Sequence, residues 1–426
     1  MTSAAPATAV RRRRRDYPGW HMVWALAVTE TIAYAALFYC FAVMVVPMRE
    51  DLGASAGQLS GALSLGIAVN GASAVLVGRW LDRHGARWVM SGGSVLGALS
   101  VVGWSQAQDL PQLYLAFVGI GLAGAAVLYE PAFVVINTWF ARDRHAALLT
   151  LTVVAGFSST IFLPLSQALV DAHGWRAALL VLAALLGACA VPQALLLRRS
   201  PADLGLGVDG DPEGPAVLET GGAPAPTGGD ALVDFAGLGG AWRRPAVRRL
   251  SLAALLETLA VTVVAVHLVA YLRDTGAAPG TAAAFAGAIG ILSVAGRVTL
   301  TALAARVGLA HLAAAMVAGQ AVGVAALLVL PRPVGLVAFV VLFGAGFGVM
   351  TIARAALLGT YVPQAVFGAV SGGQAMAAGA GRVVAPVAAG ALIGLAGYDV
   401  VLVVVAACSL GAGALLVGAE RAHRRA

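Results

Sequence analysis

Runs of about 20 apolar residues recur along the whole length of this 426-residue sequence, and each is long enough to cross the hydrocarbon core of a bilayer as an α-helix. Only 11% of the residues are charged, whereas soluble domains usually carry about 25%, so a water-soluble globule is a poor fit. The sequence therefore predicts an all-α membrane protein with many spans.

The apolar runs fall into two sets of six, separated by a long connection rich in glycine, proline and alanine. Such a connection buries too little apolar surface to fold, so residues 199–248 are predicted to be a flexible cytoplasmic linker. The organisation we expect is a basic N-terminal arm (1–20), an N-terminal bundle (21–198), the linker, a C-terminal bundle (249–419) and a tail (420–426). The predicted spans are 22–46, 57–81, 87–106, 111–138, 146–170, 176–197, 250–272, 281–304, 309–330, 334–360, 365–395 and 398–418.

All 27 basic side chains are arginines, and 20 of them lie in every second connection or at the two termini. Basic residues stay on the cytoplasmic side of a membrane, so this distribution predicts an integral protein of the cell membrane with both termini in the cytoplasm. The net charge of +7 follows the same alternation between connections, so it does not indicate binding to nucleic acid. The run Arg11 to Arg15 is expected to contact anionic lipid.

The two halves are similar to each other in sequence. Arg83 and Gly85 correspond to Arg306 and Gly308 at an offset of 223 residues, and Pro164 corresponds to Pro386 at an offset of 222. Internal repeats of this kind build many secondary carriers, whose site lies between the halves near the middle of the membrane.

The stretch "GRWLDRHGAR" (78–87) follows the second predicted span and resembles the loop signature of the major facilitator superfamily. The matching positions are Gly78, Asp82, Arg83, Gly85 and Arg87. The resemblance implies twelve helices in two pseudo-symmetric six-helix bundles, with these five residues in gating and conformational change. A glycine lets two helices approach closely, and an acidic side chain can face a helix N-terminus or an arginine.

Further stretches resemble the monocarboxylate and oxalate/formate branch of that superfamily, among them "YPGWHMVWALA" and "FLPLSQALVDAHGWRAAL". Arg297 falls where this branch keeps its substrate arginine. The chain departs from the pattern of that branch at two points, which bear on the substrate and on the route of the proton. Ser293 stands where monocarboxylate carriers often have an acid, and the lysine that animal members use in their first helix has no counterpart, because this chain has no lysine. We expect a functional monomer without cofactor or metal; Cys40, Cys189 and Cys408 lie in separate spans and suggest no metal cluster.

Two arginines inside predicted spans are candidates for substrate binding, because an ionised side chain in a membrane needs a cavity or a partner. The planar fork of Arg297 suits a carboxylate, and the alternative is a structural ion pair with Glu257 or another acid. Arg382 is either a second carboxylate contact or an arginine that reaches the cytoplasmic surface. Polar residues that could complete the site, or alternatively hold helices together, are Tyr34, Asn70, Tyr129 and Gln374, with Tyr39, Asn137 and Gln167 as further candidates.

Three acidic residues and a histidine remain. Glu130 and Arg354 occupy near-equivalent places in the fourth and tenth spans, which suggests an ion pair that helps to close an inner gate; alternatively each side chain is satisfied locally. Glu30, Glu257 and His267 are candidates for carrying a proton, and the alternative for each is a neutral residue satisfied within the bundle.

The sequence thus predicts a secondary transporter that moves a small organic anion, such as a monocarboxylate, with a proton. Two alternatives keep the same fold. A proton-coupled drug exporter would have acids rather than arginines at its binding centre, and the fifth span lacks the dense glycine–proline motif of such exporters. A non-transporting membrane receptor is the other. An enzyme is not expected, since the histidine, glutamate and serine residues form no recognisable catalytic motif.

Overall fold

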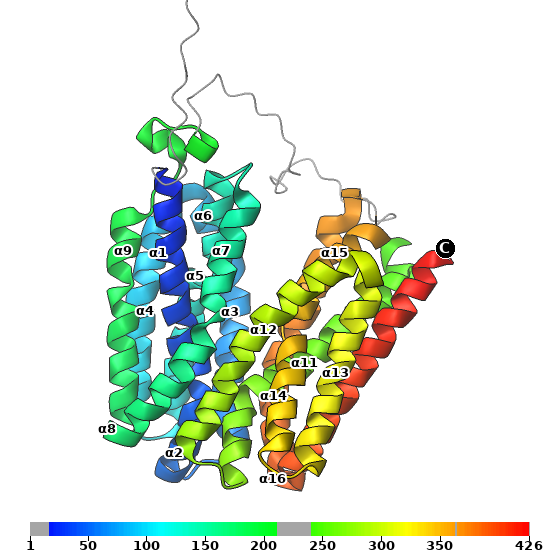
Figure 1. The fold of residues 1–426 in the computed structure, drawn as a ribbon. Helices are drawn as coiled ribbons and strands as arrows, with labels where there is room; N and C mark the ends of the chain where they lie inside the picture. Colours follow the sequence, from blue (N-terminus) through cyan, green and yellow to red (C-terminus); the bar gives the residue numbers. More distant parts are fainter. Residues whose placement is uncertain (1–16, 211–239, 363, 426) are drawn as a thin grey trace, which may run out of the picture.

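The computed structural model describes residues 17–210, 240–362 and 364–425, and it consists of helices and connecting turns over these ranges (Figure 1). The basic run of the N-terminal arm and residues 211–239 of the predicted linker lie outside the described residues. The first half contains α1 (Pro18–Tyr34), a π-helical turn η2 (Ala35–Tyr39), α2 (Phe41–Leu52), α3 (Ala56–His84), α4 (Ala86–Gln106), α5 (Leu110–Val127), α6 (Tyr129–Trp139), α7 (Arg144–Gly156), α8 (Ser158–Ala188) and α9 (Ala190–Leu196). The second half contains α11 (Pro245–Asp274), α12 (Pro279–Val307), α13 (Leu309–Val329), α14 (Val334–Gly346), α15 (Val349–Tyr361) and α16 (Gln364–Arg424).

Eight helical stretches among the described residues are long and apolar enough to cross a membrane. Two of them, Ala146–Leu196 and Gly373–Arg424, have 51 and 52 residues, whereas one crossing needs about 20. Each of the two turns back at a glycine with non-helical backbone angles, Gly174 and Gly397 respectively. With α3 and α4, of 29 and 21 residues, the total is consistent with the twelve predicted crossings.

The internal repeat of the sequence is also a repeat of backbone conformation. Three pairs of glycines with positive φ stand 223 residues apart: Gly53 and Gly276, Gly85 and Gly308, Gly174 and Gly397. Only glycine adopts this conformation without strain, so each pair ends a helix at the same point of its half. The starts of α3 and α12, and those of α4 and α13, differ by the same 223 residues. The halves are therefore two copies of one helical arrangement.

The two bundles pack together at the end opposite the termini and diverge toward the end that holds Pro18 and Arg424 (Figure 1). We call these the far end and the terminal end. Near the far end, the backbones of Gly57 in α3 and Gly390 in α16 touch, and the Thr160 hydroxyl donates a 2.7 Å hydrogen bond to the Gly287 carbonyl. An apolar cluster continues across the junction, with Val43 of α2 packed among side chains of α11 and α12. The described contacts between bundles thus close the far end.

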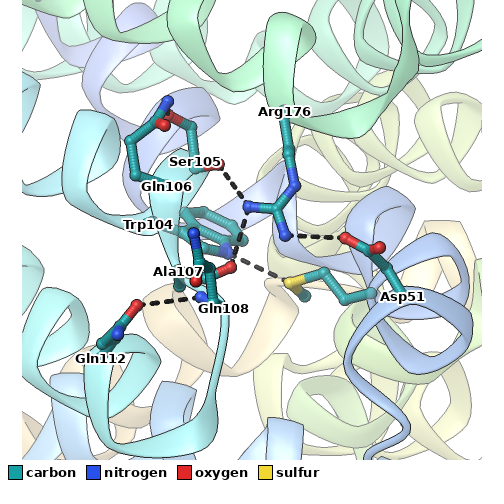
Figure 2. A network of polar contacts seen from close by, with 9 residues as sticks. Asp51, Trp104, Ser105, Gln106, Ala107, Gln108, Gln112 and Arg176 are labelled. Atoms are coloured by element: carbon teal, nitrogen blue, oxygen red, sulfur yellow. Dashed lines mark hydrogen bonds and ion pairs between the residues drawn. The ribbon is translucent and has the colours of Figure 1, made fainter.

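An arginine ties three connections together at the far end of the first bundle (Figure 2). The Arg176 guanidinium donates 2.7 and 2.8 Å hydrogen bonds to the carbonyls of Ser105 and Ala107, and a 2.8 Å bond to the carboxylate of Asp51. Ser105 lies in the last turn of α4 and Ala107 follows it, Asp51 lies in the last turn of α2, and Arg176 begins the returning arm of α8. One side chain therefore links segments that are distant in sequence.

At the terminal end, the start of the long connection is structured. Residues Ser200–Gly210 include the short 3-10 turns η3 (Pro201–Leu204) and η4 (Val208–Gly210). The Asp209 carboxylate accepts hydrogen bonds from the backbone N–H groups of Ala141, Arg142 and Asp143, at 3.1, 2.7 and 3.3 Å. This contact anchors the connection to the loop between α6 and α7. The flexibility of residues 211–239 stays a prediction.

Candidate functional site

A cavity of about 120 Å³ lies between the two bundles, midway along the spans. Tyr34, one of its lining residues, is the last of the 17 residues of α1, which places it about 24 Å along the 35-residue Pro18–Leu52 stretch at 1.5 Å per residue. Both bundles contribute to the walls. The lining residues are Tyr34, Tyr39, Tyr129, Ala155, Gly156, Ser159 and Leu163 from the first bundle and Val264, Ala265, Leu268, Ala286, Ile289, Gly290, Ser293, Arg297 and Phe347 from the second.

Four interruptions of the helices surround this cavity. They are the π-turn η2 after Tyr34, the break at Leu128 between α5 and α6, the break at Phe157 between α7 and α8, and the break at residues 347–348 between α14 and α15. Helix interruptions inside a membrane are tolerated where they line a cavity, and transporters use them at substrate sites. Their coincidence here marks this level of the protein as the candidate site.

Arg297 is positioned by two glycines of closely packed helices. Gly296 in α12 lies against the Ala345 carbonyl group of α14, at a point where no Cβ atom would fit. The guanidinium lies over Gly348, where an added Cβ would be 2.8 Å from Nε and 3.0 Å from Cζ. Gly348 also has φ +82°, a conformation that favours glycine, and it is the residue directly before α15, so the same glycine separates α14 from α15 and makes room for the arginine.

Arg297 has no anionic partner among the described residues. Its Nε is buried without a hydrogen-bond acceptor, and the ion pair with Glu257 that we considered is not formed. Arginine remains charged in proteins, and an uncompensated charge away from water is costly. The arrangement therefore leaves a cation facing a cavity, where an anionic ligand could satisfy it.

Of the residues predicted to bind substrate, Tyr34 and Tyr129 line the cavity together with Arg297. The other three do not. Asn70 packs its amide against Gly124 inside the first bundle, where an added Cβ would be 2.5 Å from Nδ2. Arg382 is exposed on α16 and lies within electrostatic range of Tyr34.

Gln374 belongs to a polar network near the terminal end of the second bundle. Its amide oxygen accepts a 3.2 Å hydrogen bond from Arg354 Nη1, and its Nε2 donates a 2.9 Å bond to the Ser251 hydroxyl. Glu130 is exposed in the first turn of α6, and among the described residues no ion pair joins it to Arg354. The two bundles diverge at the terminal end in this conformation (Figure 1), so the predicted gate pair stays untested.

Glu30 is the buried acid nearest to the cavity. It is 0% exposed, one helical turn from Tyr34, and within electrostatic range of Tyr34 and Tyr129. Neither carboxyl oxygen has a hydrogen-bond partner among the described residues. An ionised carboxylate without partners is unfavourable in such surroundings, so the protonated form is the one that this packing tolerates.

Glu257 and His267 lie inside the second bundle instead. The Glu257 carboxylate accepts a 2.9 Å hydrogen bond from the Gln320 side chain, whose amide oxygen accepts a 3.1 Å bond from Ser409. His267 Nε2 lies 3.2 Å from the Pro386 carbonyl oxygen of α16. Both residues have structural partners, and neither lines the cavity.

The signature loop shows a division of roles. Gly85, with φ +78°, ends α3 and lets α4 begin at the next residue. Arg83 is exposed, and the Arg87 guanidinium lies 4.8 Å from the centre of the Trp88 ring. Gly78 has open space where a Cβ would stand, so the close helix approach that we expected there does not occur in this conformation. The side chain of Asp82 lies outside the described residues.

Ser293 lines the cavity although it was not among the predicted site residues, and Tyr39, one of the further candidates, lines it as well. Ser293 precedes Arg297 by four residues and so shares its helix face, a signal that the sequence contains. Tyr39 follows Tyr34 by five residues, a spacing that regular α-helix would place on different faces. No spacing pattern in the sequence indicates the π-turn that brings Tyr39 into the cavity.

Comparison with known proteins agrees with this architecture. The model of the Major Facilitator Superfamily matches residues 26–334. Monocarboxylate transporter 13 of Bos taurus is 29% identical over 78% of this chain and 73% of its own length. Monocarboxylate transporter 11 of Homo sapiens is 32% identical over 39% of this chain and 35% of its own length.

Solved structures show the same fold at low sequence identity. The nucleoside transporter NupG has a TM-score of 0.72 at 12% identity, covering 94% of this chain and 99% of its own. A bacterial homologue of the human lysosomal transporter Spinster, in an inward-facing and unoccupied conformation, has a TM-score of 0.68 at 17% identity and covers 96% of both chains. The repeat, the helix interruptions and the family match together show that this chain is an integral membrane transporter that belongs to the Major Facilitator Superfamily.

Proposed function

We propose that the protein moves a small organic anion, a monocarboxylate, together with a proton by alternating access between its two bundles. The observation that carries this proposal is the guanidinium of Arg297, which faces the cavity without an anionic partner among the described residues. A carboxylate would supply two acceptors in the geometry that the guanidinium fork prefers. The names of the similar monocarboxylate transporters support the same class of substrate.

The charges at the cavity favour this substrate over a cationic drug. Arg297 is the charged residue among those that line the cavity, and the buried acid nearest to it, Glu30, is not part of the lining. A cation would meet repulsion from Arg297 without an acidic counterpart. Arg382 is a second candidate contact, reached if the bundles close at the terminal end.

Glu30 is the candidate for the proton carrier. It is a buried carboxyl group without hydrogen-bond partners among the described residues, and Tyr34, four residues along the same helix, lines the cavity. Glu257 and His267 are less suited because their partners lie within the second bundle. Exchange of a proton at Glu30 would thus be coupled to the occupation of the neighbouring cavity.

The arginine distribution supports an orientation with both termini in the cytoplasm of a cell membrane. The terminal end is then the cytoplasmic one, and the conformation described here is inward-facing. Glu130 and Arg354 would meet when this end closes. Distance measurements between labelled bundles would test this pair: a Glu130→Gln variant with an unchanged distribution of states would exclude it as a gate.

Ligand binding and transport are tested in two steps. The purified protein in detergent is melted with and without lactate, pyruvate, formate, oxalate and cationic drugs, at pH 5.5 and 7.5. A ligand that binds only the folded state adds about 2.7 kcal/mol at 100 times its Kd. We expect stabilisation by a carboxylate that is lost in Arg297→Gln and kept in Arg332→Gln, an exposed arginine outside the cavity. Stabilisation by cations alone, unaffected by Arg297→Gln, would refute the proposal.

The proton is tested in proteoliposomes. Glu30→Gln imitates the protonated acid permanently, so we expect carboxylate exchange at equal pH to continue while uptake driven by a pH gradient is lost. Glu257→Gln is the matched control and should keep gradient-driven uptake. If Glu30→Gln still accumulates substrate against its gradient, another group carries the proton.

A further inference from the structure

Three tyrosine rings gather on the first-bundle wall of the cavity. The ring centres of Tyr34 and Tyr129 are 4.7 Å apart, and those of Tyr34 and Tyr39 are 6.3 Å apart. Tyr129 also stacks on Phe133 at 5.3 Å, with only 5° between the ring planes. The tyrosine rings are therefore held at the edge of a larger aromatic cluster.

The π-turn is what brings Tyr39 to this wall. Residues five apart in a regular α-helix point about 140° away from each other. In η2 the Cys40 N–H instead bonds to the Ala35 carbonyl at 2.9 Å, a five-residue step that places Tyr34 and Tyr39 on one face. Such single π-turns are frequent at functional sites. The chain thus departs from regular helix at the point where this adds an aromatic ring to the cavity.

The phenol groups on this wall are free. Tyr34, Tyr39 and Tyr129 are half-buried and line the cavity, and among the described residues none of their hydroxyl groups has a hydrogen-bond partner. The opposite wall is mostly apolar, with Val264, Leu268, Ile289 and Phe347, apart from Ser293 and Arg297.

The size of the cavity suits a single ring. Its volume of about 120 Å³ is comparable with the roughly 150 Å³ of an engineered protein cavity that holds benzene. Aromatic rings attract one another at centre distances of about 4.5–7 Å, which is the spacing of the tyrosines here. A flat ring would therefore fill the cavity and extend the cluster, and a substituent charge would reach Arg297.

We propose that the preferred substrate is a monocarboxylate with a flat aromatic body, and that Tyr39 determines this preference. The proposal rests on the proposed function, because Arg297 is taken to hold the carboxylate. The tyrosine rings stack on the body of the substrate, and their free hydroxyl groups can bond to polar substituents on it.

The test compares ligands that differ in one property each. Benzoate is compared with cyclohexanecarboxylate, which has a similar size without a flat ring, and with benzamide, which lacks the charge. Two further ligands are lactate, a small carboxylate without a ring, and glycine betaine, a carboxylate that carries a quaternary ammonium group. We expect benzoate to bind the purified protein about tenfold more tightly than cyclohexanecarboxylate, as one to two aromatic contacts allow. Tyr39→Leu should reduce this ratio to near one, and Tyr39→Phe should keep most of it. Tyr114→Leu, a tyrosine near the far end that bonds to the Gln58 carbonyl, is the control and should not alter it.

The outcomes separate this inference from the proposed function. If aliphatic carboxylates bind through Arg297 as tightly as benzoate, the function stands and the aromatic preference is wrong. If no carboxylate binds, the proposed function itself fails. Equal binding of benzoate and benzamide, or a preference for glycine betaine, would also overturn the inference. Should Tyr39→Leu fail to fold, Tyr129→Leu replaces it with the same expected loss of preference.

Discussion

Replacement of Gly296 by alanine tests whether close helix packing positions Arg297. The new Cβ would collide with the Ala345 carbonyl oxygen and would lie 2.8 Å from the carbonyl carbon and 3.0 Å from Cα of the same residue. These atoms belong to the backbone of α14 and cannot rotate aside, so α12 must move away. Overpacking of this kind costs about 1–3 kcal/mol, and the better helix propensity of alanine offsets about 0.5–1 kcal/mol.

We therefore expect Gly296→Ala to lower stability by about 1–2 kcal/mol, which corresponds to a fall in melting temperature of roughly 2–8 °C for a domain of this size. The matched control is Gly319→Ala in α13, where no atom lies within 4 Å of an added Cβ, and it should be neutral or stabilising. The assay is thermal unfolding in detergent, followed by titration with the carboxylate that the wild type binds. Because Arg297 is the next residue, affinity should fall as well. Equal melting temperatures and affinities for the two variants would refute the packing argument.

Three further predictions concern other parts of the molecule. Arg176→Ala removes three hydrogen bonds from a partly exposed side chain and should lower the free energy of unfolding by about 1–3 kcal/mol, measured by thermal unfolding; no change would mean that solvent replaces those bonds. Gln320→Leu leaves the buried Glu257 carboxyl without its donor and should cost about 1–3 kcal/mol, whereas a Gln320→Leu, Glu257→Leu double variant that is equally unstable would place the cost elsewhere. Gly390→Val puts a side chain against the backbone of Gly57 and should open the far end, so distances between labels there should lengthen; an unchanged distribution would contradict the described closure.

Several features of the fold could be predicted from the sequence. The length of the apolar runs, the scarcity of charge, and the offset between Gly85 and Gly308 are properties of the chain alone, and they predicted a membrane-spanning, repeated helical fold that the family match confirms. Arg297 was also identifiable, because a charge inside an apolar run stands out and the resemblance gave it a role. The orientation of the termini and the roles of the site residues stay predictions.

The site could be predicted only in part, because membership in a cavity depends on which helix face meets which partner. Asn70 and Gln374 are polar residues in apolar spans, as Tyr34 and Tyr129 are, yet they pack inside the bundles. Similarly, Glu30 and Glu257 lie at the same distance from the first residues of α1 and α11, Pro18 and Pro245, but Gln320 provides a donor for Glu257 and no described residue does so for Glu30. A sequence pattern gives the type of each residue and its spacing along the chain. It does not give the partners that a residue meets on distant helices, and those partners decide whether it lines the cavity.

The sequence by itself determined that the chain crosses a membrane many times as two related halves, since length, hydropathy and glycine positions act locally along each helix. The tertiary structure decided which side chains face the cavity. The contact of Tyr34 with Tyr129, and the contact of Gly296 with Ala345 that holds Arg297 over Gly348, arise from helices packed against helices. Those contacts join residues far apart in the chain, and so they exist only once the bundles have assembled.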